Sequence, residues 1–127
     1  MTFAKRVFTW AGIFGLIVMT PMYFLEPQMI AMGQPLSHPE IYYGFVGETL
    51  VFQLIFLLIG RAPARYRPLM LAGVLEKLSF GGAVWPLYLM GRTPVTPLVF
   101  GTIDLGLGVL FLISWFRTRG AARPAQR

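Results

Sequence analysis

The sequence predicts an all-α protein, a four-helix transmembrane bundle with both termini in the cytoplasm. Three observations lead to this prediction. The 127-residue chain is 56% hydrophobic and 13% charged, whereas soluble domains are about 45–50% apolar and about 25% charged. Its apolar residues form four stretches of about 20 residues, the length that a helix needs to cross the hydrocarbon core. Its basic residues gather in alternate connections, as in membrane proteins of fixed orientation.

The four predicted spans form one integral membrane domain, residues 1–127. We expect the spans at residues 7–25, 41–59, 68–90 and 95–116. Pro39, Pro68 and Pro94 stand where three of the helices would begin, a position that suits proline because its missing N–H would be unpaired there anyway. The first span extends past the length of a signal peptide and no small-residue cleavage site follows it, so we expect it to stay uncleaved.

Lysine and arginine placement predicts the orientation of the spans. Nine basic residues precede the first span, lie between the second and third, or follow the fourth: Lys5, Arg6, Arg61, Arg65, Arg67, Arg117, Arg119, Arg123 and Arg127. The other two connections contain only Arg92. Because the side richer in Lys and Arg is cytoplasmic, we expect a bacterial inner-membrane protein with a flexible basic tail, residues 117–127. This topology also explains the net charge of +6, so we predict no nucleic-acid partner.

Four ionisable residues interrupt the predicted spans at a common depth. They are Glu48 in the second span, Glu76 and Lys77 in the third, and Asp104 in the fourth. At a rise of 1.5 Å per residue, all four lie within roughly 5 Å of the midplane. A charge at the bilayer centre costs at least about 2.5–3.5 kcal/mol. We therefore expect the four side chains to turn inward and meet one another.

Helix geometry predicts how this cluster is paired. Neighbouring residues on a helix do not face each other, so Glu76 and Lys77 are poorly placed to pair. We expect Lys77 to reach Glu48 or Asp104 on another helix instead. Small residues let membrane helices approach closely, and six glycines lie on the turns or stripes of the ionisable residues: Gly44, Gly47, Gly73, Gly81, Gly101 and Gly108.

The predicted cluster holds three acids and one lysine. Burial and like charge both disfavour ionised carboxylates, so we expect at least one acid to be protonated at neutral pH. Acids that exchange protons at this depth are typical of proton relays. We assign Glu48 and Asp104 as the titrating groups and Lys77 as the counter-charge. The alternative is a fixed buried network that only sets helix packing.

Several kinds of site are excluded by composition. The chain has no cysteine, which excludes disulfide chemistry and thiolate metal sites. Its single histidine, His38, excludes a His-rich metal or bis-His haem site within one chain. His38 with Glu40 could bind a metal, but we interpret it as a solvated loop histidine. No Gly-rich nucleotide loop is present, and we predict no catalytic residue, no metal and no cofactor.

The stretch from Glu48 to Leu75 resembles the DoxX-like group of small four-helix bacterial membrane proteins. Glu48, the leucine-rich run that ends at Gly60, and the basic Arg61 match the pattern of that group. Leu50, Val51 and Phe52 depart from it, because the group usually has a small residue soon after the glutamate. The resemblance covers about a quarter of the chain. It implies a fold more than an activity, although some members are associated with quinone-linked redox chemistry.

Three functions stay open at this point. We favour a protein that binds or transports a proton, a cation or a small lipophilic molecule through Glu48, Glu76, Lys77 and Asp104. The second is a non-enzymatic helper subunit of a larger membrane complex. The third, with the least support, is an enzyme that acts on a quinone- or isoprenoid-like lipid. The expected partners are membrane lipids, a small lipophilic ligand, and a second copy in a homodimer or a larger membrane complex.

Overall fold

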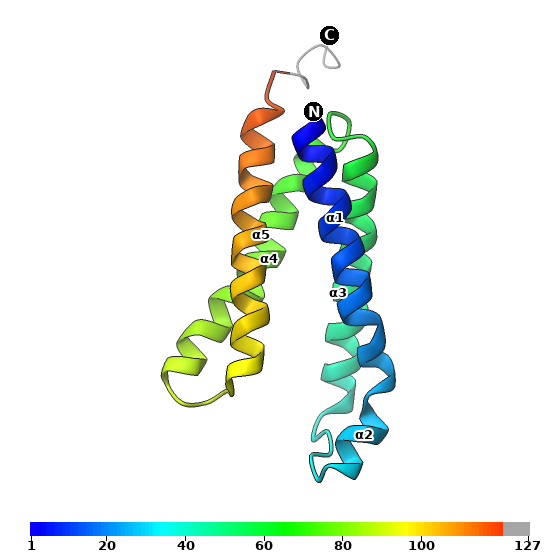
Figure 1. Cartoon of the computed structure of the whole chain (residues 1–127), viewed down its shortest axis with the longest axis vertical. Coiled ribbons are helices and arrows are strands. Elements are labelled where there is room, and N and C mark those ends of the chain that lie inside the picture. The colour runs from blue at the N-terminus through cyan, green and yellow to red at the C-terminus, as the bar shows by residue number, and fades with distance from the viewer. Residues whose placement is uncertain (121–127) are drawn as a thin grey trace.

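The structure, a computed structural model, describes residues 1–120, and this part of the chain is helical without any strand. Its elements are α1 Thr2–Met19, the 3₁₀ helix η1 Thr20–Phe24, α2 Glu26–Ala31, α3 Pro39–Arg61, α4 Arg67–Leu89 and α5 Val95–Arg117 (Figure 1). The predicted all-α class is confirmed. The short helix α2, in a predicted connection, was not expected. Beyond the turn that follows α5, the predicted flexible tail lies outside the described residues.

The ends of the long helices follow from proline and glycine. Pro39 and Pro68 occupy the first turns of α3 and α4, and Pro94 is the extended residue just before α5. Gly91 ends α4 with φ +72°, and the N–H of the next residue, Arg92, donates to the carbonyl of Leu87. This left-handed cap satisfies carbonyl groups at the helix end and favours glycine. The starts of α3, α4 and α5 and the end of α4 are therefore determined by prolines and a glycine close to them in the sequence.

Three segments are long and apolar enough to cross a membrane: Thr2–Phe24, Pro39–Arg61 and Val95–Arg117. In their most apolar parts only 22% to 28% of the residues are buried, so much apolar surface of these segments is left exposed or half-exposed. Helix α4 has the same 23-residue length as α3 and α5, but Glu76 and Lys77 stand near its centre. A membrane crossing by α4 stays a prediction.

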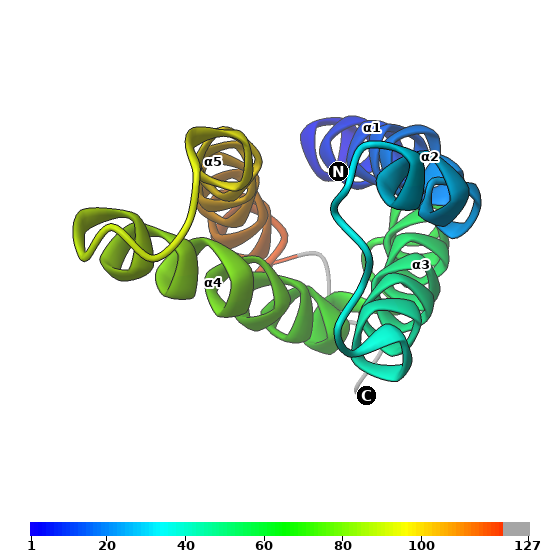
Figure 2. The same cartoon turned by 90° about the horizontal axis from the view of Figure 1, so that it is seen from below.

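The four long helices form two pairs. Helix α1 packs mainly on α3, and α4 packs mainly on α5, whereas contacts between the two pairs are fewer. The pairs meet at one end of the molecule and diverge toward the other (Figures 1 and 2). The four long helices are therefore arranged as two pairs joined at one end, and the predicted four-helix bundle is not confirmed.

An aromatic core holds the two pairs together where they meet. The Phe8 ring of α1 stacks on the Phe111 ring of α5, with centroids 4.2 Å apart, and the Phe56 ring of α3 lies 4.8 Å from Phe111. All three side chains are fully buried, as is Met70 of α4. Each long helix contributes one of these side chains, so burial of this apolar cluster fixes the arrangement of the two pairs.

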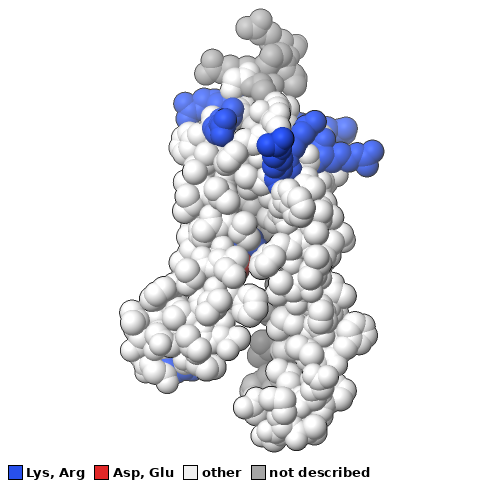
Figure 3. Space-filling view, in the orientation of Figure 1, with Lys and Arg blue, Asp and Glu red and all other residues white. Residues whose placement is uncertain are grey.

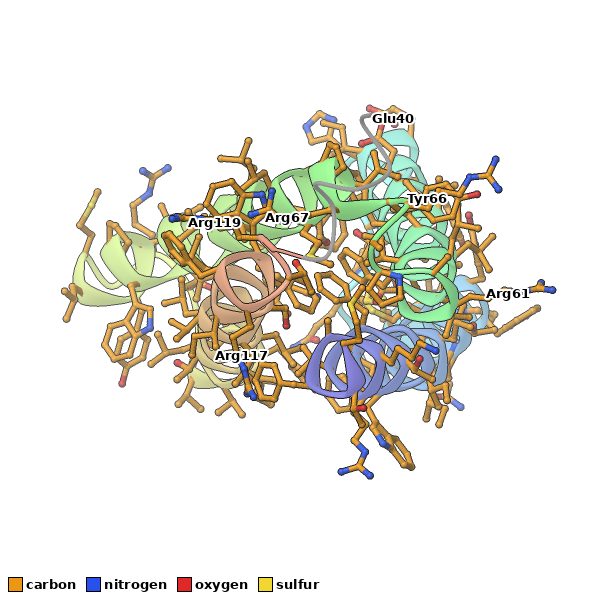
Figure 4. The ribbon with its side chains drawn as sticks, turned by 90° about the horizontal axis from the view of Figure 1, so that it is seen from above. Glu40, Arg61, Tyr66, Arg67, Arg117 and Arg119 are labelled. Atoms are coloured by element: carbon orange, nitrogen blue, oxygen red, sulfur yellow. The ribbon has the colours of Figure 1, made fainter. Side chains whose placement is uncertain are left out.

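The same end of the molecule is basic, and we call it the basic end. Seven basic residues belong to it: Lys5, Arg6, Arg61, Arg65, Arg67, Arg117 and Arg119. Both described chain ends lie here, because the Arg117 guanidinium lies 4.5 Å from the centroid of the Phe3 ring. Figure 3 shows the basic atoms over both helix pairs. Figure 4, seen from this end, shows Arg67 and Arg119 beside each other and Arg61 pointing away from the helices.

Arg67 joins the start of α4 to the end of α5. Its guanidinium donates two hydrogen bonds to the carbonyl of Trp115, at 3.1 and 2.7 Å, and one to the Thr118 hydroxyl at 3.2 Å. The guanidinium also lies 4.3 Å from the centroid of the Trp115 ring. A cation at a helix C-terminus satisfies carbonyls that lack partners and interacts favourably with the helix dipole.

Candidate functional site

Three of the four predicted site residues meet between α4 and α5. The Lys77 ammonium lies 3.4 Å from the Asp104 carboxylate and 3.5 Å from the Glu76 carboxylate. The Lys77 side chain is 5% exposed, that of Glu76 14% and that of Asp104 19%. The predicted contact between Lys77 and Asp104 is confirmed. The prediction that Glu76 and Lys77 would not pair is wrong, because a long, flexible lysine side chain can reach back to its neighbour.

Glycines allow α4 and α5 to come this close. A Cβ at Gly81 would lie 2.7 Å from the carbonyl oxygen of Gly101, and a Cβ at Gly108 would lie 3.3 Å from the Cβ of Lys77. Gly73 faces the rings of Phe56 and Phe111 in the same way. Small residues permit such close approach of membrane helices. The close packing predicted for the glycines of these two helices is confirmed.

The environment of Lys77 stabilises its charge. Its ammonium lies 5.2 Å from the centroid of the Phe56 ring, a distance at which a desolvated cation is attracted to the ring face. It donates a hydrogen bond to Asp104 at 3.4 Å. Two carboxylates and one ring face therefore surround a single ammonium group, which is held by contacts from α3, α4 and α5.

The charges of this cluster do not balance. With all three groups ionised, Glu76, Lys77 and Asp104 carry a net charge of −1. The Glu76 Oε2 atom is buried and accepts no hydrogen bond, although it lies 3.5 Å from the Lys77 ammonium. A buried polar atom without a partner is costly. The cluster therefore has the chemistry to take up one proton or one small cation.

Glu48 is not part of this cluster. Its residue is exposed, and it forms no ion pair among the described residues. The prediction that all four ionisable side chains would turn inward is wrong for Glu48, because α3 directs Val46, Gln53 and Phe56 toward its neighbours. Glu48 lies on another side of the helix.

The two glycines of α3 near Glu48 differ in how closely they pack. A Cβ at Gly47 would lie 2.7 Å from the hydroxyl of Tyr23, so this glycine does pack closely against the segment that follows α1. Gly44 has no atom near its Cβ position, and its predicted close packing is wrong. Gly44 and Glu48 both belong to the exposed side of α3, which no other described helix covers.

A furrow separates the α1–α3 pair from the α4–α5 pair. Figure 3 shows this depression between two lobes, wider at the end opposite the basic end, with charged atoms of both signs visible midway along it. Lys77 is the only basic residue between Arg67 and Arg92. The partial exposure of Glu76 and Asp104 and the visible charged atoms indicate that the furrow gives access to the cluster.

Gln53 is a buried polar residue that the sequence analysis did not select. It is 1% exposed, and its amide nitrogen donates to the carbonyl of Thr49 at 2.8 Å, while its Oε1 atom has no partner. The amide packs against Gly15 of α1, where a Cβ would overlap it. The sequence signal that could have identified this contact is a polar residue, Gln53, and a small residue, Gly15, at the same depth of two apolar helices.

A tyrosine cluster at the end opposite the basic end was also missed. The Tyr43 hydroxyl donates to the Glu26 carboxylate at 2.7 Å, and the Tyr42 hydroxyl donates to the carbonyl of Met22 at 2.7 Å. The Tyr23 and Tyr43 rings stack with centroids 5.9 Å apart. These contacts tie the segment after α1 to the start of α3.

The described residues contain no group of three or more His, Asp or Glu side chains that could hold a metal. His38 lies 3.3 Å from Glu40 in an exposed pair. No protein-family model, no curated protein and no solved structure matches the chain. The geometry of the Glu76, Lys77 and Asp104 cluster is therefore the basis for a functional proposal.

Proposed function

We propose that this is an integral membrane protein whose four long helices all cross the bilayer, with the basic end in the cytoplasm. We further propose that the cluster of Glu76, Lys77 and Asp104 binds and carries a proton or a small cation. The three apolar segments, Thr2–Phe24, Pro39–Arg61 and Val95–Arg117, support the membrane location. The gathering of basic residues at one end supports the orientation.

Inward-facing charges support the crossing by α4. Lys77 and Glu76 are the residues that lower the hydropathy of this helix, and both side chains are mostly buried against its neighbours. An ionisable side chain inside a membrane protein typically faces the interior and pairs there. The cluster thus presents little charge to lipid. The exposed residues nearest to it on α4 are Leu75, Leu78 and Ser79, and the Ser79 hydroxyl donates a hydrogen bond to the carbonyl of Leu75 at 2.8 Å.

The single observation that carries the proton or cation proposal is the unbalanced charge at the cluster. Glu76 Oε2 is buried and accepts no hydrogen bond, and it shares the Lys77 ammonium, 3.5 Å away, with the carboxylate of Asp104. Protonation of one carboxyl, or a bound monovalent cation, would remove the net charge of the cluster, and a bound cation would also give Oε2 a partner. The furrow would supply a path from the end opposite the basic end, which favours exchange over a static network.

A second candidate function follows from Glu48. An exposed carboxyl near the centre of a membrane helix is costly, and its exposed neighbours on α3 are the apolar Phe45 and Val51. We propose that this side of α3 contacts a second copy or a larger membrane complex, which agrees with a helper subunit. The resemblance of residues 48–75 to the DoxX-like group remains a proposal that concerns the fold.

Proton flux into liposomes tests the first proposal. The purified protein is reconstituted in liposomes that contain a pH-sensitive dye, and an acid pulse is applied while potassium and valinomycin clamp the membrane potential. We expect wild-type protein to dissipate the gradient faster than protein-free liposomes, and Glu76→Gln and Asp104→Asn to slow it. Glu40→Gln is the matched control, since Glu40 pairs only with His38 at an exposed site. Equal rates in wild type and both cluster variants would exclude proton transport by the cluster.

A further inference from the structure

Helices α1 and α5 leave an apolar groove between them on the outside of the protein. Its volume is about 570 Å³. The α1 side includes Phe3, Arg6, Trp10 and Phe14, and the α5 side includes Ile103 and Leu110. Trp10 is 67% exposed and Leu110 38%, so the groove opens outward. It forms the part of the furrow nearer the basic end.

The groove has the length of one membrane leaflet. From Phe3 to Phe14, at a rise of 1.5 Å per residue, it extends about 16 Å along α1. Half of a hydrocarbon core is about 15 Å. One end of the groove lies at the basic end, and the other reaches Ile103, the neighbour of Asp104 in α5.

Two arginines flank the groove at the basic end. Arg6 belongs to its lining. The Arg117 guanidinium lies 4.5 Å from the centroid of the Phe3 ring, which also lines the groove, and Figure 4 shows Arg117 extending from the end of α5 toward α1. Arginine binds phosphate oxygens through two parallel hydrogen bonds. An exposed tryptophan, Trp10, lies one turn below Arg6, which suits the boundary between headgroups and acyl chains.

We propose that this groove binds one anionic phospholipid from the leaflet at the basic end. One acyl chain lies along the apolar lining, and Arg6 and Arg117 hold the phosphate. The apolar lining alone would accept any acyl chain, whereas the two guanidinium groups select a headgroup with net negative charge. The inference rests on the membrane placement proposed above and is independent of proton exchange at the cluster.

Lipid titration by native mass spectrometry tests the proposal. The full-length protein in detergent is titrated separately with phosphatidylglycerol and with phosphatidylcholine of the same chains. We expect one phosphatidylglycerol to bind more tightly than phosphatidylcholine. Each arginine near the surface contributes about 1 kcal/mol toward an anionic lipid, which is about fivefold in affinity. The double variant Arg6→Gln/Arg117→Gln should therefore weaken phosphatidylglycerol binding about 30-fold.

The matched control is Arg61→Gln/Arg65→Gln, which removes the same charge at the same end. Arg61 points away from the helices (Figure 4), so this control should bind phosphatidylglycerol as the wild type does. Val7 also lines the groove. Val7→Trp, which would fill the groove, should remove binding of both lipids while circular dichroism shows an unchanged helix content. Equal affinities in the two double variants, or wild-type binding by Val7→Trp, would overturn the proposal. Equal affinity of the wild type for both lipids would show an ordinary annular contact and also overturn it.

Discussion

Replacing Lys77 by methionine should be one of the most damaging single changes in the chain. Methionine keeps an unbranched, flexible side chain as far as Cε, with sulfur in place of the δ-methylene, and lacks the ammonium group. The Asp104 and Glu76 oxygens lie 3.4 and 3.5 Å from that group, so they are at most about 7 Å from each other, where two unit charges repel by about 2 kcal/mol at an effective dielectric constant of about 20. Both carboxylates also lose their counter-charge in a mostly buried site. Removing one partner of a buried pair costs about 3–5 kcal/mol, and we expect a loss of this size.

The assay is unfolding in mixed micelles with increasing SDS, followed by circular dichroism. Lys5→Met is the matched control, because Lys5 is an exposed lysine at the basic end, and it should change the free energy of unfolding by less than about 0.5 kcal/mol. The triple variant Lys77→Met/Glu76→Gln/Asp104→Asn removes the charge of the whole cluster and should recover most of the loss. If Lys77→Met behaves like Lys5→Met, the ammonium group is not a structural counter-charge and the reasoning is refuted.

Three further predictions concern packing, a helix end and the exposed acid. Gly81→Ala should lower the free energy of unfolding by about 1–3 kcal/mol, because the new Cβ would lie 2.5 Å from Leu105 Cγ. Gly82→Ala is the control, since it has open space at its Cβ and should not lower the free energy of unfolding. The same SDS unfolding assay compares the two variants. Arg67→Gln should cost about 1 kcal/mol through its lost hydrogen bonds to the end of α5, and a loss of less than a few tenths would contradict that role. Glu48→Leu should make membrane insertion of the chain more favourable by up to about 2.5 kcal/mol and so raise the inserted fraction measured in microsomes. A lowered fraction would mean that Glu48 has a partner within the chain.

Most of the fold could be predicted from local signals in the sequence. The length of the apolar stretches and the prolines at helix starts predicted the four long helices. The uneven distribution of basic residues predicted that the basic ends of these helices lie together. What these signals could not show was the division into two pairs. That division depends on which helix surfaces are smooth enough for close contact, as at Gly81 and Gly101, and on where Phe8, Phe56 and Phe111 meet. Such matches between distant side chains are properties of the assembled structure.

The candidate site was predicted in part, and for a physical reason. Common depth and the cost of buried charge correctly brought Lys77 and Asp104 together. The depth of a residue in the membrane does not determine the direction in which its side chain points around the helix axis, however. Glu48 lies at the depth of the cluster, but its side chain points away from the buried face of α3. The buried face of α3 is set by Gln53 and Phe56, and an acid five residues from Gln53 lies about 140° away from it. Comparing helix directions as well as depths would have separated Glu48 from the other three.

The most direct test of the central claim is infrared difference spectroscopy of the protein in lipid as the pH is changed. The claim is that the cluster of Glu76, Lys77 and Asp104 exchanges a proton. We expect a protonated-carboxyl band that grows as the pH falls from about 8 to about 5 and is lost in Glu76→Gln or Asp104→Asn, because only an acid that can change its charge inside the membrane can act in this way. The band should persist in Glu40→Gln. A wild-type spectrum with no carboxyl change in this range would contradict the claim and leave the cluster as a fixed ionic contact between α4 and α5.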